Sequence, residues 1–180
     1  AHIRKEPSPI FQFNRSVIDA TADLVCAYKP QFAHYAAYEA EDQLERTIEY
    51  IHRVHPGIPV ILDAKRGDIG STMDGYFDAW LSKSAPFICD ALTVSPYLGF
   101  ESLNVVMSSA LENGKGLFVL AATSNPEGKS TQRAKFDEQT IAANIWQKLE
   151  AVNQISADPN ATLGSFGAVV GATLNLKDRK

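Results

Sequence analysis

Short apolar runs recur along the chain at intervals close to the length of one strand–helix unit. The five runs are residues 24–28, 58–64, 91–95, 117–122 and 166–171. To measure the spacing, we take one residue in or just after each of the first four runs: Lys29, Asp63, Thr93 and Ala121. Successive residues of this set are 34, 30 and 28 positions apart. Each run is nearly all apolar and bounded by turn residues, which is typical of a strand buried on both faces. Because a βα unit takes about 30 residues, the spacing predicts an α/β fold with a parallel sheet, either open or closed as a barrel.

Helical periodicity fills the intervals between these runs. The segments with helically spaced apolar residues are 11–22, 44–51, 73–81, 105–111 and 141–152. We expect the apolar stripes to pack in the core, with Phe13, Val17 and Ile18 of the first helix facing inward. Asn113-Gly114 is a typical helix end. The longer polar stretches 123–135 and 154–165 predict loops.

Charge and cysteine content exclude several classes of protein. The formal net charge is −4, which argues against a general nucleic-acid binder. Cys26 and Cys89 are the two cysteines and both lie in or beside apolar runs, so we expect buried free thiols rather than a disulfide scaffold. No apolar run approaches the ~18 residues needed to span a bilayer, and residues 1–9 lack the apolar segment of a signal peptide. We therefore expect a soluble, cytoplasmic protein with no membrane or nucleic-acid partner.

The densest group of charges directly follows the second apolar run, in the segment Asp63-Ala64-Lys65-Arg66-Gly67-Asp68. Residues i and i+2 of a strand share a face, so Asp63 and Lys65 are predicted to point the same way. Active sites of parallel α/β proteins gather at the carboxyl ends of their strands. Flanking carboxylates favour the charged ammonium, which makes Lys65 a candidate proton donor. The simpler interpretation is a structural ion pair at a strand end.

Lys29 closes the preceding apolar run in the same way, at Tyr28-Lys29-Pro30. On an adjacent parallel strand it is able to enter the cluster formed by Asp63 and Lys65. A solvated lysine at a strand end is the alternative.

A second candidate site follows the fourth run, at Gly128-Lys129-Ser130-Thr131. These residues match the tail of a phosphate-binding P-loop, which suggests a nucleotide-binding module centred on Lys129. Against this, Thr123 stands where the first glycine belongs, and Pro126 has no N–H to offer a phosphate. The sequence carries no Cys/His metal spacing and no dinucleotide-binding motif.

The segment 60–72, VILDAKRGDIGST, resembles the signature of the orotidine 5′-phosphate decarboxylase family. Further segments resemble the bacterial subgroup of that family with the longer chain: AYKPQ at 27–31, TVSPYLG at 93–99, FVLAATSNPEG at 118–128 and VVGAT at 169–173. The D-x-K-x-x-D pattern alone is shared with related sugar-phosphate decarboxylases. The combination of DAKRGDIG with TSNP is much more specific, and the resemblance covers nearly the whole chain.

The resemblance implies a TIM (β/α)8 barrel that acts as a homodimer without cofactor or metal. About five central βα units are visible here, so residues 1–180 are expected to form one incomplete barrel domain. The family's ribose-binding aspartate has no match before Phe11. Its phosphate-binding Gln and Arg are expected beyond Lys180. On this basis we expect the 180-residue chain alone to be inactive.

The resemblance also implies roles for individual residues in converting orotidine 5′-monophosphate to uridine 5′-monophosphate and CO2. Lys29, Asp63 and Lys65 match three members of an alternating charge network, and Asp68 matches the member supplied by the neighbouring subunit. Lys65 is implied as the proton donor to C6 of the pyrimidine. Asp63 is implied to lie beside the departing carboxylate.

Two further residues are implied to bind the substrate. Thr72, again from the neighbouring subunit, matches a residue near the ribose, and Ser124 matches one that binds the pyrimidine. Besides the P-loop module, two alternatives stay open at this point. One is a related sugar-phosphate decarboxylase with Mg²⁺ near Asp63, and the other is a non-catalytic scaffold or dimerisation protein.

Overall fold

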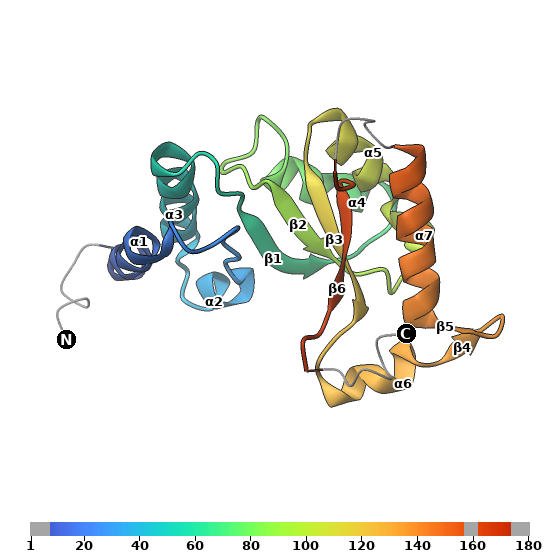
Figure 1. Cartoon of the computed structure of the whole chain (residues 1–180). Coiled ribbons are helices and arrows are strands. Elements are labelled where there is room, and N and C mark those ends of the chain that lie inside the picture. Colours follow the sequence, from blue (N-terminus) through green and yellow to red (C-terminus); the bar gives the residue numbers. More distant parts are fainter. Residues whose placement is uncertain (1–7, 157–161, 174–180) are drawn as a thin grey trace. The chain divides into compact units, whose positions relative to one another are not determined.

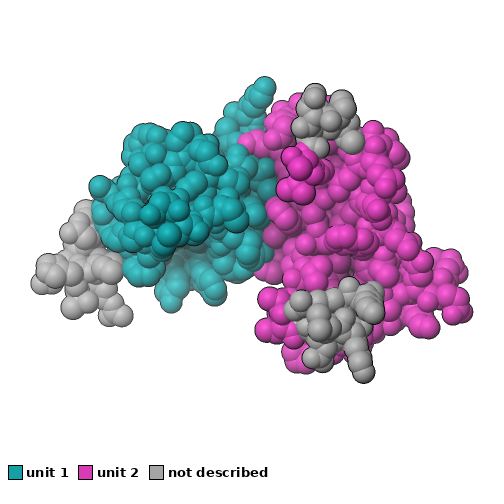
Figure 2. Space-filling model, in the orientation of Figure 1, with its two compact units in different colours: residues 1–64, 78–92 teal, residues 65–77, 93–180 magenta. Residues whose placement is uncertain are grey.

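The computed structural model describes residues 8–156 and 162–173, which fall into two compact units (Figure 2). Unit 1 contains the described part of Ala1–Ala64 together with Asp78–Leu92. Unit 2 contains Lys65–Phe77 together with the described part of Thr93–Lys180. The basic segment 177–180 lies outside the described residues, as does part of the predicted loop 154–165. Within the described parts, every helix is too short or too polar to cross a membrane.

Four of the five predicted strands are confirmed. They are β1 (Ile61–Arg66), β2 (Ala91–Val94), β3 (Gly116–Ala122) and β6 (Phe166–Val170), with hydrogen bonds joining them in the order β1–β2–β3–β6 (Figure 1). In unit 2, β3 and β6 pair in parallel with Leu117 opposite Phe166. Leu62, Leu92, Leu117 and Val119 are fully buried, as continuous apolar strands require.

The prediction of a strand at 24–28 is wrong for most of that run. Leu24 is 77% exposed and Cys26 is exposed, so the start of the run has no apolar contact to hold it in a sheet. The chain joins the edge of β1 only later, through isolated parallel bridges at Tyr28 and Gln31. The expectation of buried thiols is therefore wrong for Cys26, whereas Cys89 is buried.

Unit 1 is built around two helices, α1 (Pro9–Thr21) and α3 (Glu41–Val54), with the short α2 (Phe32–Ala36) between them along the chain. The predicted stripe of α3 is confirmed, since Leu44, Ile48 and Ile51 are buried. The orientation predicted for α1 is wrong for Phe13 and Val17 and confirmed for Ile18. Its buried side chains are Phe11 and Ile18, seven residues apart on the face toward α3, whereas Phe13 and Val17 are 53% and 42% exposed.

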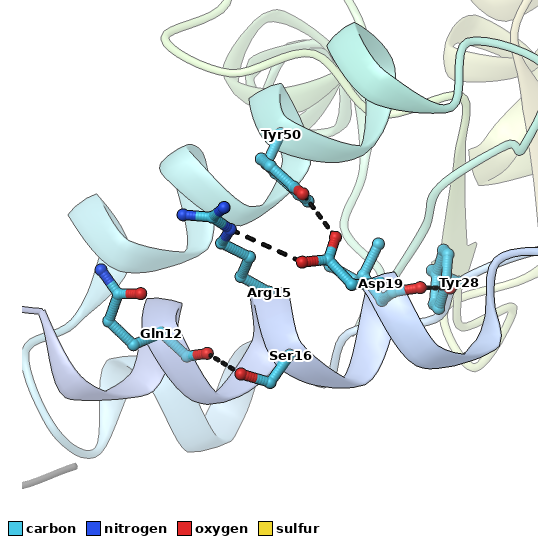
Figure 3. Close-up of polar contacts among 7 residues, drawn as sticks. Gln12, Arg15, Ser16, Asp19, Tyr28 and Tyr50 are labelled. Atoms are coloured by element: carbon cyan, nitrogen blue, oxygen red, sulfur yellow. Dashed lines mark hydrogen bonds and ion pairs between the residues drawn. The ribbon is translucent and has the colours of Figure 1, made fainter. Parts of the chain in front are cut away.

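Polar contacts tie α1 to α3 and to the chain before Lys29 (Figure 3). The Tyr50 hydroxyl of α3 donates to the Asp19 carboxylate of α1, which also lies 3.6 Å from Arg15 Nε. The hydrogen bond to Asp19 raises the pKa of Tyr50 above its ordinary value. On the other side, the Tyr28 hydroxyl donates to the backbone oxygen of Ile18 at 3.2 Å. This bond anchors the residue directly before Lys29 to α1.

Unit 2 packs α7 (Ile141–Ile155) on β3 and β6. The side chain of Thr140 caps α7 by accepting from Ala143 N at 3.1 Å, and Ile145 and Leu149 are buried. The helix predicted at 105–111 is confirmed as α5 (Asn104–Glu112), which directly follows the short η2 (Phe100–Leu103). Helix α5 ends at Glu112, just before the predicted stop at Asn113-Gly114, and the φ of +64° at Gly114 suits glycine. Helix α4 (Gly70–Trp80), whose Met73 and Phe77 are buried, follows β1.

The stretch predicted as a loop at 123–135 contains short elements. They are η3 (Pro126–Gly128) and α6 (Lys129–Gln132), followed by the hairpin of β4 (Lys135–Phe136) and β5 (Gln139–Thr140). Asp137 and Glu138 form the hairpin turn with φ of +49° and +67°. Two successive left-handed residues are typical of the turn that suits the twist of a two-residue hairpin.

Candidate active site

In unit 1 the structure brings two predicted site residues together. Lys29 Nζ forms an ion pair with Asp63 Oδ2. The Asp63 side chain is 6% exposed, whereas that of Lys29 is 53% exposed. A carboxylate this deeply buried is costly unless it is paired and hydrogen-bonded, so the ammonium of Lys29 stabilises it.

Backbone pairing explains why Lys29 meets Asp63. Asp63 N donates to Pro30 O at 2.9 Å, in the parallel bridge that joins Gln31 to Asp63. The Gln31 side chain adds a second link, donating from Nε2 to Asp63 O at 3.1 Å. With Tyr28 anchored on α1, residues 28–31 are held beside the strand that carries Asp63.

Lys65 opens unit 2 and has an unusual backbone. It lies in β1 with φ of +50°, in the left-handed region that residues other than glycine rarely adopt. Its N–H donates to Thr93 Oγ1 at 2.9 Å. The two-residue alternation behind the predicted common face of Asp63 and Lys65 is therefore broken at Lys65, and the residue is exposed while Asp63 is buried. The predicted pairing of Lys65 with carboxylates stays a prediction.

Asp68 and Thr72 lie where β1 leads into α4. Asp68 Oδ1 accepts from Ile69 N at 2.8 Å, and Thr72 N donates to Ile69 O at 3.2 Å. Gly70, with φ of +48°, begins the helix. Within one chain Asp68 therefore supports the turn before α4, and Thr72 is exposed on the first turn of that helix.

Ser124 is exposed directly after β3. Its neighbour Thr123 is held by Gln132, which accepts from Thr123 N at 2.8 Å and donates to Thr123 Oγ1 at 2.7 Å. The P-loop alternative is not supported by this geometry. The N–H of Thr123 is already bonded, and Gly128 lies inside a 3₁₀ turn that leads into the four-residue α6. A phosphate loop instead needs consecutive free N–H groups around a hollow.

The cavities of the two units differ in whether a predicted site residue lines them. In unit 1 a cavity of about 170 Å³ is lined by Lys29 and also by Tyr28, Tyr35 and Thr47. Two cavities of about 580 and 460 Å³ in unit 2 lie beside α7, and neither is lined by Lys65, Asp68, Thr72 or Ser124. Within residues 8–156 and 162–173, no three or more His, Cys, Asp or Glu residues are grouped to hold a metal ion.

Sequence reasoning missed the residues that support Asp63 and Lys65, namely Gln31 and Thr93. The available signal was a polar side chain inside or just after an apolar run. Thr93 is 2% exposed in the middle of β2, where a hydroxyl needs a hydrogen-bond partner.

Comparison with known proteins identifies the family of the chain. The family model described as Orotidine 5′-phosphate decarboxylase / HUMPS family matches residues 11–180. The chain is 46% identical over 164 residues to the orotidine 5′-phosphate decarboxylase of Cupriavidus metallidurans, and 48% identical over 166 residues to that of Streptomyces coelicolor. Each alignment covers 91% of this chain, but 56% and 58% of the respective relative.

Solved structures give the same result. A Streptomyces avermitilis protein assigned to orotidine 5′-phosphate decarboxylase matches with 44% identity and a TM-score of 0.85, over 95% of this chain and 59% of that one. The OMP decarboxylase of Leishmania donovani matches with 32% identity and a TM-score of 0.73, over 91% and 60%. The predicted fold class, an α/β TIM barrel, is thereby confirmed. The chain spans less than two thirds of the length of these relatives, and it belongs to the orotidine 5′-phosphate decarboxylase / HUMPS family.

Proposed function

We propose that the protein is a carboxy-lyase that converts orotidine 5′-monophosphate to uridine 5′-monophosphate and CO2. The observation that carries the proposal is the buried Asp63 carboxylate in its ion pair with Lys29, at the head of the DAKRGD segment. The relatives' names support the same reaction, because proteins 46% and 48% identical to this chain are called orotidine 5′-phosphate decarboxylase.

The proposed reaction breaks the bond between C6 of the pyrimidine and its carboxyl group. The electron pair of that bond stays on C6 while CO2 departs, and the Lys65 ammonium donates a proton to C6. The resulting amine is reprotonated from water. A fixed ammonium stabilises negative charge where it develops in the transition state, which is the effect that lowers the barrier.

The other predicted residues complete the proposed site. Asp63, held by Lys29, lies beside the departing carboxylate. Ser124 binds the pyrimidine. Asp68 and Thr72 act in the site of a second copy of the chain, so the enzyme is a homodimer.

Further parts of the proposal concern organisation and setting. Residues 1–180 belong to one barrel domain, the enzyme is cytoplasmic, and it uses neither cofactor nor metal. The runner-up is a related sugar-phosphate decarboxylase with Mg²⁺ near Asp63, because the matching family model covers both the decarboxylase and the HUMPS group.

The decisive experiment purifies the protein in the form in which its cell makes it and measures CO2 release from orotidine 5′-monophosphate. Lys65→Ala is expected to lower kcat by about 10³-fold, within the range that a general acid contributes. The matched control is Lys83→Ala, since Lys83 is also an exposed lysine but has no proposed role. Full activity in Lys65→Ala contradicts the proposed role of Lys65. Activity on a sugar phosphate that is lost with EDTA favours the runner-up.

The same assay on residues 1–180 alone tests the expectation that this chain is inactive by itself. Normal turnover by these 180 residues contradicts that expectation.

A further inference from the structure

Lys65 has a backbone conformation that its surroundings must enforce. A left-handed non-glycine residue costs free energy and persists only where neighbouring contacts over-determine it. Lys65 also lies within a strand, where an extended backbone is the default. Contacts on both sides of Lys65 are therefore needed to explain its φ of +50°.

On the near side, the contact is with a buried hydroxyl. Lys65 N donates to Thr93 Oγ1 at 2.9 Å, and Thr93 is 2% exposed in the middle of β2. At Lys65, where the chain turns, the backbone N–H is thus bonded to the side-chain oxygen of Thr93. Because a buried N–H without a partner is costly, Thr93 favours the one backbone geometry that directs the N–H of Lys65 toward it.

After Lys65, residues 66 and 67 pack closely against Ser95, which directly follows β2. Ser95 N donates to Arg66 O at 2.6 Å. Gly67 lies so close to Ser95 that a Cβ atom at Gly67 would be 2.4 Å from the Ser95 backbone oxygen. Residues 66 and 67 are thus fixed in place, and the turn between these contacts and the Thr93 bond falls on Lys65.

We infer that Thr93 is a positioning residue for Lys65: its hydroxyl holds the lysine backbone in the left-handed conformation that aims the ammonium. The inference rests on the proposed function in that Lys65 is taken as the proton donor. It goes beyond that function because Thr93 has no contact with the reacting atoms in the proposal. Its effect passes through the Lys65 backbone.

Thr93→Val tests the inference, because it removes the hydroxyl and keeps the shape of the side chain. We expect kcat for orotidine 5′-monophosphate to fall about 10²-fold with KM unchanged, as for a small misplacement of a catalytic group. Hydrogen exchange at the Lys65 amide is expected to become about tenfold faster, because its acceptor is gone. Thr93→Ser keeps the oxygen and is expected to restore kcat to near the wild-type value, even though it loses a buried methyl group.

The matched control is Ser82→Ala. Ser82 is 8% exposed and its hydroxyl donates to Asp78 O at 3.1 Å, so the change removes a buried hydroxyl bond elsewhere in the chain. It is expected to lower stability without changing kcat or exchange at Lys65. Thr93→Val with normal kcat, or Thr93→Ser as impaired as Thr93→Val, overturns the inference while the proposed function stands. These activity assays use the protein as it occurs in its cell. Absence of CO2 release by that wild-type protein overturns the proposed function, and the exchange measurement then still decides whether Thr93 holds the Lys65 backbone.

Discussion

Asp63 and Lys65 are two residues apart in β1 and belong to different compact units, and the chain holds them in different ways. Asp63 has a regular parallel partner at Gln31, a buried side chain and a charged partner in Lys29. Lys65 is exposed, with a left-handed backbone fixed through Thr93. The comparison shows that a buried charge is held by an opposite charge. The exposed Lys65 is held instead through its backbone N–H.

If the buried carboxylate depends on Lys29, removing Lys29 has the largest effect on stability. Lys29→Met is expected to lower the free energy of unfolding by about 3 kcal/mol, because it takes the charged partner Lys29 away from the buried Asp63 carboxylate. Asp63→Asn in the Lys29→Met background is expected to recover part of this loss. Urea denaturation measures both values.

The same substitution at an exposed pair is the control. Lys148 pairs with Glu101 at the surface, and Lys148→Met is expected to cost less than about 1 kcal/mol. An equal loss from both variants contradicts the view that burial of Asp63 makes the Lys29 pair important.

The close packing of Gly67 against Ser95 predicts the next largest effect. Gly67→Ala introduces a Cβ atom that meets the Ser95 backbone oxygen, so we expect a loss of about 2 kcal/mol. Gly75→Ala is the matched control, because a Cβ atom at Gly75 meets nothing within 4 Å and the residue lies inside α4. Alanine is expected to stabilise that helix by about 0.5–1 kcal/mol. Thermal denaturation showing the same sign for both changes breaks this interpretation.

Backbone strain at Lys65 predicts a smaller difference between two truncations. Lys65→Gly is expected to be more stable than Lys65→Ala by about 1 kcal/mol, because glycine adopts positive φ without steric cost. At Lys83, whose φ is not positive, the order is expected to be the reverse or the values equal. Chemical denaturation of the four variants makes the comparison. A Lys65→Ala variant more stable than Lys65→Gly contradicts the strain assigned to Lys65.

The smallest effect is the pH dependence of the exposed pair. The hydrogen bond from Lys148 lowers the pKa of Glu101 below its ordinary value. A lowered carboxyl pKa contributes stability at pH values above the unfolded pKa, about 4.3, and that contribution is lost as pH falls through the folded pKa. Solvent screening limits it to about 0.3 kcal/mol. Wild type and Glu101→Gln should therefore differ near pH 7 and converge near pH 3 in urea denaturation.

Much of the fold followed from local pattern. The runs at 58–64, 91–95, 117–122 and 166–171 became strands because continuous apolar segments between turns have to be buried on both faces. The run at 24–28 did not, although its composition is similar. Strand formation there depends on what lies beside the run, and the exposed Leu24 has no such neighbour in the described structure.

The candidate site was predictable only in part. The pairing of Lys29 with Asp63 was predictable from the sequence. Lys29 closes one apolar run and Asp63 lies at the end of the next, and parallel neighbouring segments bring such ends together. The prediction that Asp63 and Lys65 share a face relied on the alternation rule, which assumes an extended backbone at every residue, and the backbone of Lys65 is not extended. The positive φ of Lys65 comes from contacts with residues about 28 positions away, and no local pattern reports them.

The amino-acid order by itself determined four of the strands and their spacing, the identity of the charged residues that follow the apolar runs, and the family. Local hydrophobic periodicity and short motifs suffice for these. Only the tertiary structure decided which charge is buried and which backbone is forced into the left-handed region. These depend on contacts between segments far apart in the chain, where burial and hydrogen-bond geometry set the free energy.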